Sequence, residues 1–239
     1  MIIGSGLLAH AFASYFGVSE STCVYAAGVS NSGCTDRREF QRERNRLTTA
    51  VAEYRSADLF IYFGTCSANA PSTPATPYVA HKVKMEAIAA THPSYLILRL
   101  PQVAGYTPNP HTLLNFLFNR ISRSERFQVW ARARRNIIDV EDAARIAAAL
   151  AIGETVRRER IDIGNFSDQA VPDIVQVIAN VVGKQPICDY LDRGDEHTVD
   201  TRRIRSAVER LGVSFDGDYV ERVIRKYYSH EATVPRLIS

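Results

Sequence analysis

Four short apolar segments, each followed by a segment that can form a helix, constrain the fold of this chain most. The apolar segments are Met1–Ile3, CVYAAG at 23–28, LFIYFG at 59–64 and YLILRL at 95–100. Apolar strands that alternate with helices are typical of a parallel sheet covered on both faces. We therefore predict an α/β protein with a doubly wound parallel sheet.

The pattern changes after Pro101, where helices become more frequent and strands shorter. A chain of 239 residues can form one sizeable core and a smaller lobe. We predict a core over residues 1–105, to which residues 136–164 return. Residues 106–135 and 165–239 are predicted to form a small C-terminal lobe.

Composition argues against several classes of protein. A net charge of +3 is only mildly basic, and we expect no nucleic-acid partner. The chain has no apolar run of the roughly 18–20 residues that a membrane-spanning helix needs, and its six histidines lack metal-site spacing. Because its four cysteines are far apart and no signal peptide precedes them, we expect reduced thiols and a cytoplasmic protein without a metal.

Tyr78 and Lys82 are the strongest candidates for catalytic residues. They are four positions apart in a predicted helix, 78–91, and so share one helix face. An ammonium beside a phenol favours the phenolate and lowers the pKa of the tyrosine. A phenol of that kind can exchange a proton with a carbonyl or an alcohol. The alternative is an exposed tyrosine and an exposed lysine with no shared role.

A glycine turn follows the first predicted strand. Gly4, Gly6 and Ala9 form a GxGxxA pattern directly after the strand and at the start of a helix. Such a turn lets backbone N–H groups at the helix N-terminus approach a pyrophosphate. A plain strand–helix turn is the alternative interpretation.

Taken in order, the motifs of the chain resemble those of the extended short-chain dehydrogenase/reductase family, of the NAD-dependent epimerase/dehydratase type that acts on nucleotide sugars. The likeness covers most of the chain. The motifs that carry it are GSGLLA, AAGVSNS, TCS at 65–67, RLPQVAG, NIIDVEDAARIAAAL, and IDIGNFSDQAVPDIVQVIANVVGK. The resemblance implies a Rossmann-like fold, a nicotinamide dinucleotide and a nucleotide-sugar substrate.

The resemblance also implies roles for individual residues. Thr65 would bind the substrate oxygen, and with Tyr78 and Lys82 it would form the catalytic set. The expected cofactor-binding residues are Gly4, Ser5, Gly6, Leu7, Leu8, Ala27, Gly28, Ser30, Thr65, Tyr78, Lys82, Pro101 and Val103. The expected substrate-binding residues are Ser67, Gln102, Asn115, Arg132 and Arg135. For the two arginines, a solvated surface position is the alternative.

The chain departs from the family pattern between its first helix and the AAG-type strand. Only about six residues, Gly17–Thr22, separate them, where family members have two further strands. We therefore expect a sheet that lacks a strand pair and a shortened adenosine side. The residue that reads the adenine ribose lies in the missing part, so the choice between NAD and NADP stays open.

The resemblance predicts a nucleotide-sugar epimerase or ketoreductase of polysaccharide or deoxysugar biosynthesis. A 4,6-dehydratase is not expected, because Cys66 and Ser67 stand where such enzymes carry an acidic pair. The alternative is a non-catalytic binding or sensor protein on the same scaffold. A homodimer through the helices at 38–55 and 78–91 is also expected from the resemblance.

Overall fold

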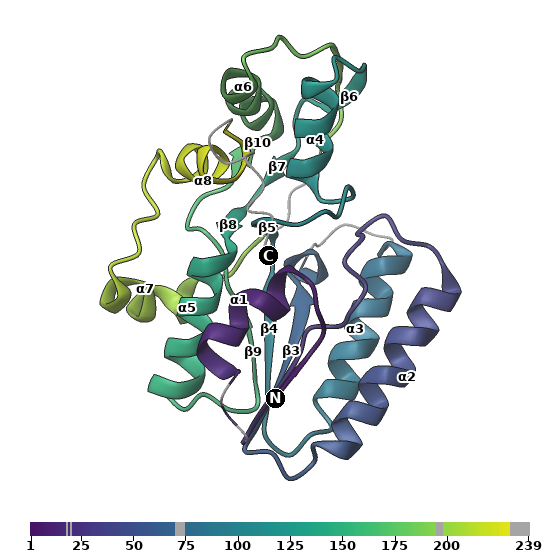
Figure 1. Cartoon of the computed structure of the whole chain (residues 1–239), viewed down its shortest axis with the longest axis vertical. Coiled ribbons are helices and arrows are strands. Elements are labelled where there is room, and N and C mark those ends of the chain that lie inside the picture. The colour runs from purple at the N-terminus through teal and green to yellow at the C-terminus, as the bar shows by residue number, and fades with distance from the viewer. Residues whose placement is uncertain (18, 20, 70–74, 195–197, 230–239) are drawn as a thin grey trace, which may run out of the picture.

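A central sheet of five parallel strands organises the computed structural model of the chain (Figure 1). The structure describes residues 1–17, 19, 21–69, 75–194 and 198–229. The strands are β1 (Ile2–Ile3), β2 (Thr22–Tyr25), β3 (Leu59–Thr65), β4 (Tyr95–Leu100) and β9 (Glu159–Asp162), in the order β1-β2-β3-β4-β9. Every neighbouring pair is parallel, which confirms the predicted doubly wound, Rossmann-like sheet.

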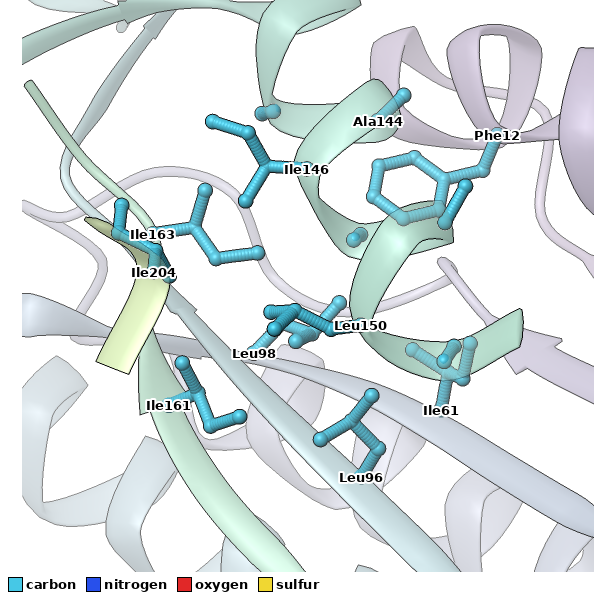
Figure 2. Close-up of a cluster of buried hydrophobic side chains, with 14 of the residues drawn as sticks. Phe12, Ile61, Leu96, Leu98, Ala144, Ile146, Leu150, Ile161, Ile163 and Ile204 are labelled. Atoms are coloured by element: carbon cyan, nitrogen blue, oxygen red, sulfur yellow. The ribbon is translucent and has the colours of Figure 1, made fainter. Parts of the chain in front are cut away.

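Helices cover both faces of this sheet. On one face, α1 (Leu7–Phe16) and α5 (Val140–Ala148) pack against Val24, Ile61 and Leu98 (Figure 2). On the other face, α2 (Arg37–Glu53) and α3 (Pro77–Ala89) pack against alternate residues of the same strands, Cys23, Tyr25, Phe60, Tyr62 and Ile97. Because successive side chains of a strand point to opposite faces, continuous apolar runs such as LFIYFG supply both layers.

The strand pair that was expected to be absent is absent from the described residues. There, β1 forms one edge of the sheet, and α1 leads directly to β2. The chain moves across the sheet in the same direction from β1 to β2 and from β2 to β3, yet α1 and α2 lie on opposite faces. The two crossovers are therefore of opposite hand, although parallel β–α–β units share one hand in nearly all cases.

The remaining elements mostly gather around a separate apolar cluster. It contains residues of α4 (Leu113–Ser122), β6 (Phe127–Trp130), α6 (Val171–Val182) and α8 (Tyr219–Tyr228). The short pairs are β5 (Gln102–Ala104) with β8 (Ile137–Asp139), β6 with β11 (Cys188–Leu191), and β7 (Arg134–Arg135) with β10 (Gln169–Ala170).

One helix within the predicted small lobe packs elsewhere. α7 (Arg205–Leu211) follows a short 3-10 turn at Arg202–Ile204 and packs with α5 in the cluster of the large sheet (Figure 1). The proposed division into two lobes remains a prediction, with α7 closer to the first. No helix in the described part of the chain is long and apolar enough to span a membrane.

The first glycine of the turn after β1 is required by the backbone. Gly4 has φ +136°, and a Cβ there would lie 2.4 Å from the carbonyl oxygen of Ala26. Gly6 has φ −90°, and a Cβ there would meet no atom within 4 Å. Only the first position is therefore closed to an ordinary side chain.

We predict that Gly4→Ala lowers the free energy of unfolding by about 1–3 kcal/mol, because it forces a Cβ into a strained conformation beside the backbone of β2. Chemical denaturation measures the loss. Gly6→Ala is the matched control and should leave stability within about 0.5 kcal/mol of the wild type. Equal losses in the two variants would contradict this account of the turn.

Candidate active site

A cavity of about 1000 Å³ opens where the strands of the large sheet end. Its walls include the residues that directly follow β1, β2, β3 and β4, and carboxyl ends of parallel strands commonly form ligand sites. The volume is at the upper end of the range of about 300–1,000 Å³ for small-molecule pockets. The cavity is therefore large enough for an extended ligand.

The structure brings most of the predicted site residues to this cavity. All thirteen residues expected to bind the cofactor line it, as do three of those expected to bind the substrate. They are Gly4, Ser5, Gly6, Leu7, Leu8, Ala27, Gly28, Ser30, Thr65, Tyr78, Lys82, Pro101, Val103, Ser67, Gln102 and Arg135.

Asn115 and Arg132 do not line the cavity. The Asn115 amide donates to the carbonyl oxygens of Thr107 and Asn109, at 2.9 and 2.8 Å, and accepts from the Tyr228 hydroxyl. Asn115 therefore holds a loop of the cavity wall in place. Arg132 pairs with Asp192 at 3.0 Å, and both side chains are largely exposed.

Local sequence explains why Tyr78 and Lys82 lie at the cavity. The Thr76 side chain caps α3 by accepting from the Val79 N–H at 3.2 Å, and Pro77 occupies the first helical turn. Tyr78 then lies at the start of the helix and Lys82 one turn further on. Both side chains are buried, with only 9% and 4% of their surface exposed.

The environment of Tyr78 differs from the one that the sequence predicts. Burial, followed by the charge of Glu43, raises the pKa of Tyr78, whereas Lys82 was expected to lower it. Among the described residues, no group forms a hydrogen bond with the Tyr78 hydroxyl. The wall around it includes Thr65, whose hydroxyl accepts from the Ser67 N–H at 3.2 Å.

A buried carboxylate, Glu43, explains the difference. Its side chain is fully buried and lies 3.2 Å from the Lys82 ammonium. It also accepts hydrogen bonds from the Val29 N–H at 2.7 Å and the Tyr62 hydroxyl at 2.9 Å, and lies 2.9 Å from the His81 ring nitrogen Nε2. The Lys82 ammonium further lies 4.6 Å from the centre of the Tyr62 ring.

The protonation states of this pair follow from its contacts. Burial alone would raise the pKa of Glu43, but Lys82, the Val29 N–H, His81 and Tyr62 outweigh it and hold that pKa below the ordinary value. Burial lowers the pKa of Lys82, and Glu43 opposes that shift. Because these donors stabilise the negative charge, the Glu43 carboxylate stays ionised although its side chain is buried.

Sequence reasoning missed Glu43, although a signal was present. Glu43 lies on the stripe of α2 that also carries Leu47, Ala50 and Val51, all of which are buried. A charged residue on the apolar stripe of an amphipathic helix is unusual, because buried charges need partners. The residues that supply those partners come from β3, α3 and the turn after β2, and their convergence was not predicted.

Gly28 lies directly over the same pair. A Cβ at Gly28 would lie 2.7 Å from a carboxylate oxygen of Glu43 and 3.0 Å from the Lys82 nitrogen. The close approach of the backbone to the ion pair thus favours glycine here, whether or not a cofactor binds.

Cys66 lines the cavity but does not have the character of a nucleophile. Burial, and after it the charge of Asp162, raises the pKa of the Cys66 thiol well above its ordinary value. A thiol that stays protonated reacts poorly, which agrees with the interpretation of Cys66 as a lining residue.

Comparison with known families decides the relationship of the chain. The sequence profile of the NAD dependent epimerase/dehydratase family matches residues 20–164, more than half of its length. The chain belongs to this family. The match begins at residue 20 and does not include the glycine turn at residues 4–6. A search of curated protein sequences finds no significant match.

Solved structures of epimerases and dehydratases have a similar fold. The UDP-glucose 4-epimerase of Thermus thermophilus, in complex with NAD, is 14% identical with a TM-score of 0.69 over 95% of this chain and 83% of that one. A mutant of the Bacillus cereus UDP-glucuronic acid 4-epimerase, in complex with UDP-4-deoxy-4-fluoro-glucuronic acid and NAD, is 18% identical with a TM-score of 0.71 over 95% of this chain and 79% of that one. DesIV of Streptomyces venezuelae, a dTDP-glucose 4,6-dehydratase, is 16% identical with a TM-score of 0.69 over 93% and 78%.

We predict that Glu43→Gln destabilises the protein by about 3–5 kcal/mol, because it leaves the buried Lys82 ammonium without its counter-charge. Denaturant unfolding at neutral pH measures the loss. Because the folded pKa of Glu43 lies below its ordinary 4.5, the stabilisation is complete above that pH and disappears as the pH falls through the lower folded pKa. The difference in free energy of unfolding between the variant and the wild type should therefore become smaller in acid.

Glu39→Gln is the matched control on the same helix. Glu39 is about half exposed and pairs with Arg42 at 2.8 Å, so its loss should cost at most about 1 kcal/mol. Comparable losses in the two variants would show that Glu43 has no special structural role.

Proposed function

We propose that the chain is an NAD(P)-dependent nucleotide-sugar epimerase or ketoreductase of the short-chain dehydrogenase/reductase type. In this proposal Tyr78, Lys82 and Thr65 carry out the proton transfer that accompanies hydride transfer. The observation that carries the proposal is the Tyr78 hydroxyl, which has no partner among the described residues and lies in a cavity that also contains the glycine turn. In a family that uses nicotinamide dinucleotides, this hydroxyl is the group available to a substrate oxygen.

The glycine turn supports a place for the diphosphate of such a cofactor. α1 begins at Leu7, its first turn carries no acidic side chain, and the space next to Gly6 is empty to 4 Å. Free N–H groups at a helix N-terminus favour a phosphate there. Gly4, Ser5 and Gly6 would hold the diphosphate, and Pro101 and Val103 would line the nicotinamide side. When bound, the cofactor would supply or accept a hydride at the sugar carbon.

Side chains of the protein would bind the oxygen on the same sugar carbon and exchange a proton with it. Tyr78 would donate a proton to that oxygen, or accept one from it, and Thr65 would orient it. Ser67, Gln102 and Arg135 would contact other parts of the nucleotide sugar. We place the enzyme in the cytoplasm, in polysaccharide or deoxysugar biosynthesis, and expect a homodimer through α2 and α3, where Val83 is an exposed apolar residue.

A second candidate is a binding or sensor protein that retains the fold without turnover. The shortened sheet favours it, because the strand that reads the adenine ribose in family members has no counterpart among the described residues. The buried site argues against it, since binding alone does not require a buried tyrosine with a free hydroxyl beside an ion pair.

We predict that one of NAD, NADH, NADP and NADPH binds in calorimetric titration, and that Gly6→Ala weakens this binding about tenfold or more by filling the space for the diphosphate. Gly153→Ala is the control, because its Cβ would also meet nothing within 4 Å but lies outside the cavity lining. If none of the four binds, alone or with nucleotide sugars present, the proposed function is wrong.

We predict that Tyr78→Phe lowers turnover of a nucleotide sugar by about 10²–10⁴-fold and leaves ligand binding intact, because only the proton is lost. Turnover is measured by product analysis after incubation with a panel of UDP- and dTDP-sugars. Tyr106→Phe is the control, since Tyr106 also lines the cavity but its hydroxyl donates to the carbonyl oxygen of Lys226. Binding without turnover by the wild type would favour the sensor.

A further inference from the structure

The dinucleotide of the proposed function would have its adenosine at the margin of the sheet. Its diphosphate would lie at the glycine turn after β1, and its nicotinamide beside Pro101 and Val103, which follow β4 inside the sheet. In an extended dinucleotide the adenosine lies on the far side of the diphosphate from the nicotinamide. With the strand order β1-β2-β3-β4-β9, that direction leads away from β4 and toward β1 and β2.

The cavity wall on this side is formed in part by α2. Because α2 connects β2 to β3, whereas α3 connects β3 to β4, α2 is the nearer of the two helices to the margin of the sheet (Figure 1). It contributes three charged side chains to the cavity lining, those of Glu39, Arg42 and Arg46. The two arginines are four positions apart and therefore share one face of the helix.

The charges on this wall do not cancel. Glu39 is the only carboxylate among the described residues of the lining, and Arg42 donates to it from Nε at 3.1 Å and from Nη2 at 2.8 Å. Lys82 and Arg135, which also line the cavity, have partners as well. Arg46 forms no hydrogen bond or ion pair with a described residue, so its positive charge is available to a ligand.

A buried tyrosine shows the direction in which the two arginines extend. Tyr25 lines the cavity, is 1% exposed, and donates from its hydroxyl to the carbonyl oxygen of Glu43 at 3.3 Å. Burial, and after it the charge of Glu43, raises the pKa of Tyr25, whereas Arg46 and Arg42 oppose that rise. Both guanidinium groups are therefore close enough to the sheet to act on a buried hydroxyl, instead of pointing away from the cavity.

We propose that Arg46, with Arg42 beside it, binds the 2′-phosphate of an NADP-type dinucleotide, so that the chain takes NADP and NADPH in preference to NAD and NADH. A guanidinium offers a planar fork that matches phosphate oxygens. Sites that prefer NAD instead place a carboxylate on the 2′-hydroxyl of the ribose, and here the carboxylate of Glu39 is held by Arg42. The inference rests on the proposed function and deepens it by naming the cofactor.

The shortened sheet explains why this group would come from a helix. The sheet ends at β1, so among the described residues no strand outside β1 can carry the side chain that contacts the adenine ribose. Another element of the cavity wall must supply it. Through Arg46, α2 brings an unpaired positive charge to the side of the cavity where that contact is needed.

The test is isothermal titration calorimetry with NADPH and with NADH at one fixed salt concentration, because salt screens contacts with phosphate. In the wild type we expect NADPH to bind about tenfold or more tightly than NADH. Arg46→Ala should weaken binding of NADPH by about ten- to a hundredfold, through the loss of a charge-assisted hydrogen bond, and leave that of NADH within about twofold. Arg46 is exposed, so its replacement leaves the core untouched.

Two controls separate this contact from a general effect of charge. Arg44 is also an exposed arginine of α2 but does not line the cavity, so Arg44→Ala should leave both affinities unchanged. The fragments 2′,5′-ADP and 5′-AMP differ by the 2′-phosphate alone and probe the adenosine side without the nicotinamide. Binding of 2′,5′-ADP should depend on Arg46, and binding of 5′-AMP should not.

The outcomes distinguish this inference from the proposed function. Equal binding of NADPH and NADH by the wild type, or an equal loss for both in Arg46→Ala, would overturn the inference and leave the proposed function intact. A loss of the same size in Arg44→Ala would also overturn it. If none of the dinucleotides and neither fragment binds, both are wrong. Binding of NADPH that depends on Arg46, without turnover of any nucleotide sugar, would support the site and favour the binding protein over the enzyme.

Discussion

The buried ion pair between Glu43 and Lys82 is the contact on which the arrangement of the candidate site depends. Through its partners it joins α2, α3, β3 and the turn after β2, which are four separate segments of the chain. Each of these segments also contributes to the cavity wall. A buried charge tolerates little displacement of its partners, because an unmade hydrogen bond to it is costly. The pair therefore fixes the relative positions of the walls as well as the charge of the floor.

The second constraint is the order of strands. With β1 at the edge, α1 reaches β2 across the face opposite to α2, where it packs on α5. The apolar side chains of α1, Phe12 and Phe16, are buried in this layer, and the Phe12 ring lies edge-on to Phe63 of β3. Packing of this extent compensates for an uncommon connection, because burial of two aromatic side chains contributes several kcal/mol.

The sequence was sufficient to predict the parallel sheet and the helices between its strands, and most of the site residues that it predicted lie at the cavity. Strands such as LFIYFG are apolar on both faces, and Pro77 after Thr76 marks the start of α3, so these elements depend on local pattern. The motifs of the family then predicted which strand ends meet. Asn115 and Arg132 were assigned to the substrate by resemblance, and the structure places them away from the cavity lining, in contacts that no local pattern indicates. The interaction of Glu43 with Lys82 spans 39 residues of sequence and could not be predicted from the spacing of either helix.

The edge position of β1 has a consequence for how such a chain can change in length. A two-residue strand at the margin of a sheet pairs on one side only, and nothing else in the described sheet depends on its outer side. A strand pair inserted between α1 and β2 would extend the sheet outward from β1 without breaking any existing pairing, while the floor formed by β3, α2 and α3 would be unchanged. The margin of the sheet outside β1 and the cavity floor are thus separable modules of one fold, and a chain can gain strands at the first without rebuilding the second.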